Sequence, residues 1–209
     1  MFYSALIGKP VEHSISPLLY NELANILGVE YAHIKIEIRD EGDLEDTLNS
    51  LEKLKFCGLN VTLPYKIRII NFVDSQDEKS KKIGAVNTIV FNKNKKIGYN
   101  TDARGAFRAI EHKLKKVDKN DNILVLGAGG AARAIIFDLY KKCKNIDLLN
   151  INKEEARKIY AKVAERRIEL PFVQVSSRST QQRFSLFIEH GKPADAATQG
   201  TFSHYGLSP

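Results

Sequence analysis

Three stretches of this 209-residue sequence end in residues suited to acid–base or hydrogen-bonding chemistry. GLNVTLPYK places Asn60, Thr62 and Lys66 after an apolar run, GAVNT contains Asn87, and GYNTD ends at Asp102. A partly desolvated lysine beside a carboxylate can donate or accept a proton near neutral pH. We therefore interpret Lys66 and Asp102 as a candidate acid–base pair among amide and hydroxyl groups that hold substrate oxygens. A short helix is predicted to begin at Pro64, and a lysine in the first turn of a helix, taken alone, is usually just solvated.

The stretch HSISP places two hydroxyl groups two residues apart, just before a predicted helix. Ser14 and Ser16, beside a helix N-terminus, are suited to binding a carboxylate. The alternative is that Ser16 only caps the helix, with Pro17 in its first turn. His13 is better explained as a loop residue that holds a turn than as a catalytic base.

GAGGAA follows the apolar run ILVL and opens a predicted helix, which is the context of a dinucleotide-binding turn. The first glycine allows the tight turn, the second lets the backbone approach a pyrophosphate, and Ala132 allows close packing of helix and strand. A plain tight turn is the alternative. The predicted cofactor-binding residues in this turn are Gly127, Ala128, Gly129, Gly130 and Ala131.

The end of the next predicted strand should select the cofactor. An acidic residue there binds the ribose 2′-hydroxyl of NAD, whereas an arginine accommodates the 2′-phosphate of NADP. This sequence has Asn150 and Lys153, with neither a carboxylate at the strand end nor an arginine. Lys153 could meet a phosphate as a point charge or be a solvated residue at a helix start.

Apolar periodicity predicts elements that bring these residues to one sheet edge. Strands are expected at 2–8, at 31–38 and before Thr62, separated by helices at about 16–27 and 43–54, an order typical of a parallel α/β sheet. Polar residues at the carboxyl ends of parallel strands converge. AVNTIVF and KIGYNT flank a turn at 92–95 and predict a hairpin.

A second α/β unit is expected after the polar KNDN at 119–122. Asp102 is predicted to cap a helix over 103–117, and strands at 122–126 and 146–151 alternate with helices at 131–140 and 153–165. We predict two lobes: a substrate-binding and catalytic domain at 1–118, and the start of a Rossmann-like NAD(P)-binding domain at 119–165.

The composition changes after Glu165. Residues 166–209 contain one lysine, no asparagine and four glutamines, whereas residues 1–165 contain 21 lysines, 14 asparagines and one glutamine. Only FSLFI keeps a strand-like apolar run. We interpret 166–209 as an atypical tail, either divergent or disordered or derived from a different reading frame or a truncation. The Rossmann-like lobe is accordingly expected to be incomplete.

The overall composition, 43% hydrophobic and 27% charged, is that of a globular protein, without an apolar run long enough for a membrane span or a secretory signal. Cys57 and Cys143 are expected to be buried free thiols in a reducing cytoplasm. The lysines behind the net charge of +7 are scattered and not interleaved with aromatic residues, which disfavours nucleic acid and favours small anionic ligands.

Taken together, HSISP, GLNVTLPYK, GAVNT, GYNTD and GAGGAA resemble the shikimate dehydrogenase family over about residues 1–165. The resemblance implies reversible NADPH-dependent reduction of 3-dehydroshikimate to shikimate, a step towards chorismate and the aromatic amino acids, in a cleft between the two lobes. It implies that Ser14 and Ser16 bind the substrate carboxylate and that Lys66 is the acid–base residue. The ring hydroxyls would be held by Thr62, Asn87 and Asp102.

The same resemblance places Glu78 near the nicotinamide and the turn at 127–131 on the pyrophosphate of NADP. Family members that prefer NADP carry arginines where this chain has Ile151 and Glu155, so NAD, as in quinate/shikimate relatives, is the alternative cofactor. The family's later segments have no counterpart after Glu165. Two hypotheses follow: a working dehydrogenase, monomeric or homodimeric, or a remnant that binds shikimate-like ligands without efficient turnover.

Overall fold

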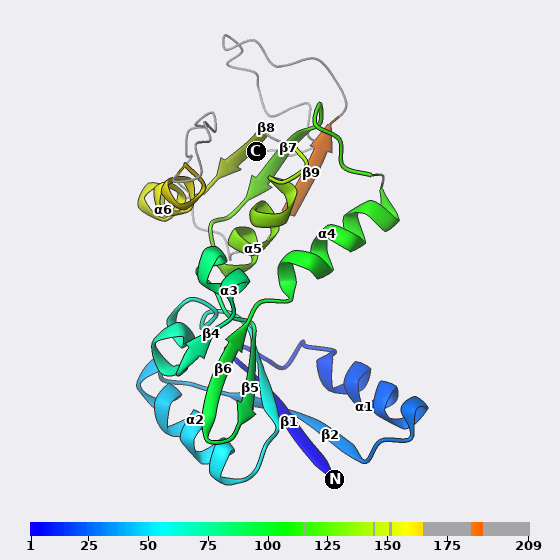
Figure 1. The fold of residues 1–209 in the computed structure, drawn as a ribbon, viewed down its shortest axis with the longest axis vertical. Coiled ribbons are helices and arrows are strands. Elements are labelled where there is room, and N and C mark those ends of the chain that lie inside the picture. Colours follow the sequence, from blue (N-terminus) through cyan, green and yellow to red (C-terminus); the bar gives the residue numbers. More distant parts are fainter. Residues whose placement is uncertain (115, 144, 151, 165–184, 190–209) are drawn as a thin grey trace.

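The computed structural model describes residues 1–114, 116–143, 145–150, 152–164 and 185–189. They form two α/β lobes, each built around its own sheet and stacked along the long axis of the molecule (Figure 1). The N-terminus lies in the lower lobe of that view, and α3 (Glu78–Ile83) and α4 (Asp102–Lys113) lie where the two lobes meet. The predicted two-lobe α/β architecture is therefore confirmed.

The first sheet has six strands in the order β2-β1-β3-β5-β6-β4. Its first three strands are mutually parallel, as predicted, with Ala5 of β1 opposite both Ile34 of β2 and Leu59 of β3. The elements of this part are β1 (Phe2–Gly8), α1 (Ser16–Leu27), β2 (Tyr31–Glu37), the 3-10 helix η1 (Glu41–Asp43), α2 (Leu44–Lys53) and β3 (Gly58–Val61).

The predicted hairpin is also present and extends this sheet on the far side of β3. Strands β5 (Thr88–Asn92) and β6 (Lys95–Tyr99) pair antiparallel around Lys93 and Asn94, whose φ angles of 49° and 60° match a tight hairpin turn. The 3-10 helix η2 (Arg68–Phe72), the edge strand β4 (Ser75–Gln76) and α3 (Glu78–Ile83) precede the hairpin.

One prediction for this region is wrong. The chain does not enter a helix at Pro64 but passes through turns, and helical structure begins only at Arg68. Lys66 therefore lies in a turn, where its backbone carbonyl accepts a hydrogen bond from Val86 N–H (2.7 Å). This bond ties the turn to the start of β5.

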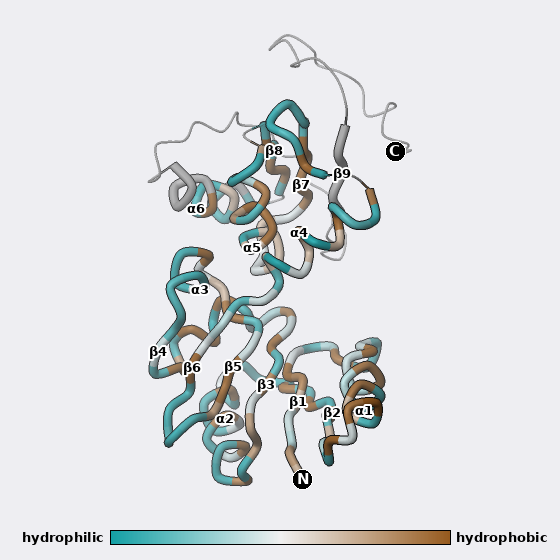
Figure 2. The backbone as a smooth tube through the Cα atoms, turned by 45° about the vertical axis from the view of Figure 1, so that its right-hand side comes forward, coloured by the Kyte–Doolittle hydropathy of each residue, from teal (hydrophilic) through white to brown (hydrophobic). Residues whose placement is uncertain are grey.

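The first lobe has its apolar core on only one face of the sheet. Ala5, Ile7 and Leu59 point from the strands towards Leu44 and Leu48 of α2, and all five side chains are buried. On the other face lies α1, of which Ala24 is the only buried residue. Figure 2 shows the strongly apolar colouring of α1, and its large apolar side chains are exposed.

The second sheet is small, with strand order β8-β7-β9. β7 and β8 are parallel, as predicted, whereas β9, which contains most of FSLFI, is antiparallel to β7. The third parallel strand of a mononucleotide-binding unit is not among the described residues. The elements are α4 (Asp102–Lys113), β7 (Asn122–Leu126), α5 (Gly130–Leu139), β8 (Asn145–Leu149), α6 (Lys153–Ala164) and β9 (Ser185–Glu189).

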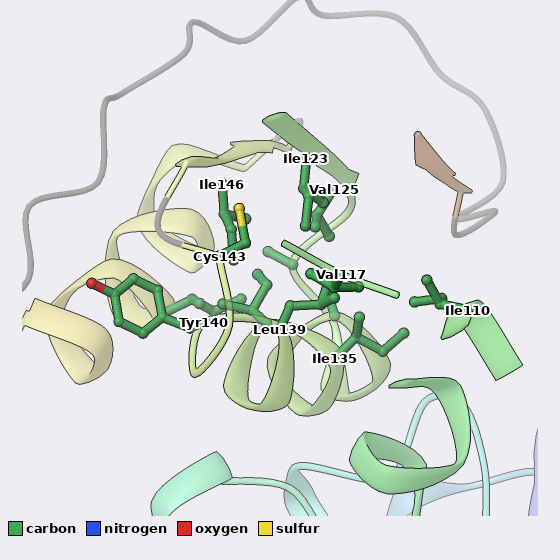
Figure 3. Close-up of a cluster of buried hydrophobic side chains, with 13 residues drawn as sticks. Ile110, Val117, Ile123, Val125, Ile135, Leu139, Tyr140, Cys143 and Ile146 are labelled. Atoms are coloured by element: carbon green, nitrogen blue, oxygen red, sulfur yellow. The ribbon is translucent and has the colours of Figure 1, made fainter. Parts of the chain in front are cut away.

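A single buried cluster holds this lobe together (Figure 3). Ile110 of α4 and Ile135 of α5 pack with Ile123 and Val125 of β7, so α4 contributes to the core of the second lobe. The predicted helix over 103–117 is shorter in the structure, and Leu114, directly after its last residue, is exposed. The boundary between domains at residue 118 remains a prediction.

The two thiols differ in burial. Cys143 is buried within the cluster of Figure 3, and its Sγ–H donates to the carbonyl of Asp121 (2.7 Å). Cys57 is exposed at the start of β3, so the prediction of a second buried thiol is wrong. The residues that follow it in β3, Gly58 and Leu59, are buried, but Cys57 itself lies on the surface.

Among the helices that the structure describes, none is both long enough and apolar enough to cross a membrane.

Candidate active site

The predicted acid–base pair is formed. Lys66 Nζ lies 2.7 Å from Asp102 Oδ2, although 36 residues separate them, and both side chains are largely buried (18% and 25% exposed). Lys66 comes from the turn after β3 and Asp102 from the first turn of α4. Partial burial strengthens the attraction relative to an exposed surface pair. The lysine ammonium is thus fixed in place by a carboxylate at the junction of the two lobes.

Asn87 completes this arrangement from the start of β5. Its Nδ2 donates to Asp102 Oδ1 (2.7 Å) and to Thr101 Oγ1 (2.9 Å), while its Oδ1 accepts from Thr101 N–H (2.9 Å) and from Thr88 Oγ1 (3.0 Å). Both oxygens of the Asp102 carboxylate are therefore held, one by Lys66 and the other by Asn87. Such a connected polar network keeps the Asp102 carboxylate and the Lys66 ammonium in one geometry.

Asp102 does not cap its helix, contrary to the sequence prediction. It is the first residue of α4, Thr101 precedes it as N-cap residue, and neither side chain makes a capping hydrogen bond. The carboxylate turns to Lys66 and Asn87 instead, although its place in the first turn still lets the helix dipole stabilise its negative charge. Thr101 was not predicted as a site residue, although it lies within the GYNTD motif.

The glycine-rich turn approaches the same place from the second lobe. A methyl group on Gly130 would lie 2.7 Å from Lys66 Cβ and 3.4 Å from Ala85 Cβ, so the backbone at this position packs directly on the lysine side chain. Gly130 is also the first residue of α5. The residue predicted to meet a phosphate thus also determines how closely the glycine-rich turn approaches Lys66.

The remaining positions of the turn fit a backbone that binds an anion. Gly127 has a φ of 99°, which disfavours any residue with a side chain, and its N–H donates to Leu149 O (2.7 Å). Gly129 is exposed, and a Cβ placed on it would meet nothing within 4 Å. Ala128 and Ala132 are buried beneath, and Ala131 is half-buried. The turn therefore presents accessible backbone N–H groups at the N-terminus of α5.

An ion pair and an apolar contact connect the lobes beside this site. Lys79 of α3 lies 3.0 Å from Asp138 of α5, and Lys141 contacts the other carboxylate oxygen at 2.6 Å. Burial raises the pKa of Asp138, but hydrogen bonds from Lys141 and Lys79 outweigh this effect and lower it overall. Beneath the ion pair, Ala134 of α5 packs with Ile83 of the first lobe.

The two predicted carboxylate-binding serines lie together at the start of α1. Ser14 Oγ–H donates to Ser16 Oγ (3.0 Å), and Ser14 Oγ accepts from Ser16 N–H (3.2 Å). Ser16 is itself the first helical residue, so the prediction that it is the N-cap is wrong: Ser14 receives the helix-start N–H instead. Thr62 follows β3 with its methyl group against Gly8, and His13 is exposed in a turn.

The cofactor-binding candidates outside the turn are more scattered. Glu78 begins α3 as an exposed residue paired with Lys81 (3.0 Å). Asn150, at the end of β8, donates to Glu155 Oε2 (3.2 Å). The side chain of Lys153 lies outside the described residues.

Arg133 is a residue that the sequence did not single out. It follows the glycine-rich turn on α5, its Nε is buried without a hydrogen-bond partner within the described part of the chain, and burial lowers its pKa while nearby Glu155 opposes that shift. The sequence signal that could have identified Arg133 as a site residue is its position directly after GAGGAA.

The fold and the site together define a two-lobe α/β protein in which a glycine-rich turn of the second lobe packs against the side chain of Lys66. Residues 6–89 match the family model described as "Shikimate dehydrogenase substrate binding domain". The NADP⁺-dependent shikimate dehydrogenase of Methanococcus maripaludis is 43% identical over 152 residues, which cover 73% of this chain and 53% of that protein. Over about three quarters of its length the chain is therefore similar to shikimate dehydrogenases, and it spans about half the length of such curated relatives.

Solved structures agree with this assignment. A shikimate dehydrogenase crystallised with NADP⁺ has a TM-score of 0.75 and 35% identity, covering 82% of this chain and 61% of its own. The enzyme of Thermus thermophilus, in complex with NADP(H) and shikimate, has a TM-score of 0.73 and 29% identity, covering 83% and 63%.

The C-terminal part has a second match. Residues 138–209 match the family model described as "CRISPR-associated protein (Cas_Csy4)". This match begins at Asp138 within α5 and includes the whole tail whose composition differs from that of residues 1–165.

Proposed function

We propose that this chain carries the catalytic machinery of a shikimate dehydrogenase, which reversibly reduces 3-dehydroshikimate to shikimate with NADPH. The observation that carries the proposal is the network of Lys66, Asp102 and Asn87, held at the N-terminus of α4 and packed against Gly130 of the nucleotide-binding turn. This network supports Lys66 as a proton donor at the junction of the proposed substrate lobe and the proposed phosphate-binding turn.

The protein residues have distinct roles in this reaction. The Lys66 ammonium donates its proton to the carbonyl oxygen of the substrate, and Asp102 holds the ammonium in position while Asn87 holds Asp102. We assign Ser14 and Ser16 to the substrate carboxylate, and the ring hydroxyls to Thr62, Asn87 and Asp102. Bound NADPH supplies the hydride.

The glycine-rich turn fits a dinucleotide. The positive φ of Gly127 allows the tight turn, and the exposed, uncrowded Gly129 leaves backbone N–H groups at the start of α5 open to a pyrophosphate. Relatives named for NADP⁺ support NADP as cofactor. NAD is the alternative, because Asn150 at the end of β8 contacts the Glu155 carboxylate, which would repel a 2′-phosphate. Glu78 and Lys153 remain proposed cofactor contacts.

Two assays on the purified chain test the proposal. The first follows shikimate-dependent reduction of NADP⁺ and of NAD⁺ at 340 nm. The second measures whether shikimate raises the melting temperature, since a ligand that binds only the native state stabilises it. Both are repeated with Lys66→Met and with Lys82→Met, a matched control on the exposed surface of α3.

The outcomes separate the hypotheses. Turnover that falls by about 10²-fold or more in Lys66→Met and stays unchanged in Lys82→Met supports the dehydrogenase. A thermal shift without turnover indicates the remnant that binds shikimate-like ligands. A folded chain with neither signal contradicts the substrate assignment. Sedimentation in the same buffer distinguishes monomer from homodimer, and the cytoplasmic location stays a prediction.

We also propose that the chain joins segments of two families, with the junction between residues 138 and 165. The support is that the Cas_Csy4 model matches 138–209 and that the composition changes within this range, whereas translation in a wrong frame gives no reason for such a match. Single sequencing reads that span the junction in the source DNA would support the joined chain. Reads that always end at the junction would contradict it.

A further inference from the structure

We infer that Asn21 is a positioning residue for the two serines at the start of α1. This inference rests on the proposed function, because it concerns the site assigned to the substrate carboxylate. In this role Asn21 acts without a hydrogen bond to either serine. It fixes the helix that carries them to the edge of the first sheet.

Asn21 pairs with the backbone of the edge strand β2 almost as another strand would. Its Oδ1 accepts from His33 N–H (2.8 Å), and its Nδ2 donates to His33 C=O (3.3 Å). β2 is the terminal strand of the sheet, so these backbone groups face away from β1. A primary amide carries both a donor and an acceptor and can satisfy both groups of one residue at once, whereas a carboxylate only accepts and cannot. The contact therefore fixes α1 at one point along β2.

Apolar burial does little to hold α1 in place. Only Ala24 of its twelve residues is buried, whereas the remaining large aliphatic residues of the helix are about half to four-fifths exposed, namely Leu18, Leu19, Leu23, Ile26 and Leu27. A helix normally owes its position to the packing of an apolar face. Here that contribution is small, so directional polar contacts set the position of α1.

The ring beside Asn21 reinforces this anchor. Tyr20 stacks on His33, with the ring centroids 4.6 Å apart, and His33 Nδ1 lies 2.5 Å from Ser4 Oγ on the neighbouring strand β1. His33 is almost completely buried. The backbone of His33 binds Asn21 while its side chain binds β1, so the contact point on β2 is itself immobilised.

The anchor acts on the serines through the rigidity of the helix. Asn21 lies five residues after Ser16, about 7–8 Å along the axis at 1.5 Å per residue. Ser16 is the first residue of α1, and Ser14 is hydrogen-bonded to it. A rotation or slide of α1 on β2 displaces both hydroxyls together. Loss of the Asn21 contact should therefore weaken carboxylate binding without touching Lys66 or Asp102.

The test is a double-mutant cycle on shikimate affinity, measured by calorimetry on the full chain. The variants are Asn21→Ala, Ser14→Ala and the double variant, with Asn25→Ala as the matched control on the exposed side of the same helix. We expect Asn21→Ala to raise the Kd at least fivefold, Asn25→Ala to change it less than twofold, and Ser14→Ala to have a much smaller effect when Asn21 is already absent.

A second readout separates this inference from the proposed function. Hydrogen exchange of the α1 amides near Ser16 should accelerate in Asn21→Ala and in Asn21→Asp, which keeps the acceptor but loses the donor, and not in Asn25→Ala. Unchanged exchange, or a Kd within twofold of wild type, overturns the inference. Absence of shikimate binding by the wild-type chain overturns the assigned substrate, and accelerated exchange would then establish the anchor alone.

Discussion

The backbone of Gly130 packs against the side chain of Lys66, so that the third glycine of the glycine-rich turn and the proposed proton donor are in direct contact. The space between them is smaller than a methyl group, since a Cβ at position 130 would lie 2.7 Å from Lys66 Cβ and 3.3 Å from Lys66 Cδ. In the general dinucleotide fingerprint, glycines serve the tight turn, the pyrophosphate and helix–strand packing. In this chain Gly130 serves a fourth purpose, the close approach of the two lobes at Lys66.

We therefore predict that Gly130→Ala impairs turnover without unfolding the protein. The added methyl group must displace Lys66 from Asp102 or push the lobes apart, and a misplacement of about 1 Å can cost about 10²-fold in rate. Steady-state kinetics with shikimate should show the loss mainly in kcat. The control is Gly105→Ala on the exposed side of α4, where a Cβ meets nothing within 4 Å. It should keep its activity and gain about 0.5–1 kcal/mol in stability. A fully active Gly130→Ala would contradict the role given to this contact.

The ion pair between Lys79 and Asp138 should determine how firmly the lobes are held together. Asp138 is 11% exposed and Lys79 28%, so removing the lysine leaves a mostly buried carboxylate with Lys141 as remaining partner. We expect Lys79→Met to lower the free energy of unfolding by about 1–2 kcal/mol in urea titrations. Lys82→Met, on the exposed face of the same helix, should change it by less than about 0.5 kcal/mol.

The pH dependence of this effect has a definite sign. Burial raises the pKa of Asp138, but its hydrogen bonds with Lys141 and Lys79 lower it overall below the usual value. The folded protein then binds fewer protons than the unfolded chain at this site, so the stability it contributes is present above about pH 4 and is lost as the pH falls through the folded pKa. Asp138→Asn should remove that part of the acid sensitivity. An unchanged acid transition in this variant would count against the assignment.

The convergence of Lys66, Asp102 and Asn87 could be predicted from the sequence. Each follows or ends an apolar run, and the ends of neighbouring strands meet at one sheet edge. The parallel order of the first three strands and the hairpin could also be predicted, from the apolar periodicity and from the turn residues between the segments. These features depend on local sequence patterns that only a few arrangements of strands and helices can accommodate.

Other features depend on partners that no local pattern encodes. An aspartate before a helix favours a cap, but Lys66, 36 residues away, binds the carboxylate of Asp102. The contact between Gly130 and Lys66 requires the relative placement of two lobes. The apolar periodicity of α1 defines a face, but periodicity does not say what covers it. The exposure of Cys57 likewise depends on neighbours rather than on its own segment.

The exposed face of α1 leads to a prediction about solubility. Leu19, Leu23 and Ile26 lie on this face and are each about half or more exposed. Contiguous apolar patches of this kind promote association. Replacing Leu19 and Ile26 with glutamate should raise the concentration at which the chain stays monodisperse in light scattering, at a cost below about 0.5 kcal/mol each, because neither side chain is buried. Replacement of buried Ala24 by glutamate is the opposite control and should prevent folding. If aggregation begins at the same concentration in this variant as in wild type, the exposed face of α1 is not the cause of association.

The buried His33 should make the first lobe sensitive to mild acid. Its Nε2 has no hydrogen-bond partner within the described residues, and burial lowers the pKa of its ring. The unfolded chain takes up a proton near pH 6.5, whereas the folded lobe resists it, so the unfolded state binds more protons and stability falls as the pH drops below that value. Tyr20, Tyr31 and Ser4 surround the ring, and none of them is a carboxylate that could compensate the new charge.

Urea titrations at pH 8 and pH 5.5 measure this effect. The midpoint of wild type should be lower at pH 5.5, and His33→Asn, which keeps a polar atom near the position of Nδ1 but cannot titrate, should show a much smaller difference between the two pH values. Its midpoint at pH 8 should be lower than that of wild type, because the stack with Tyr20 is lost. His112→Asn, exposed on α4, is the matched control and should retain the wild-type difference. A His33→Asn variant with the full wild-type difference would show that acid acts at another group.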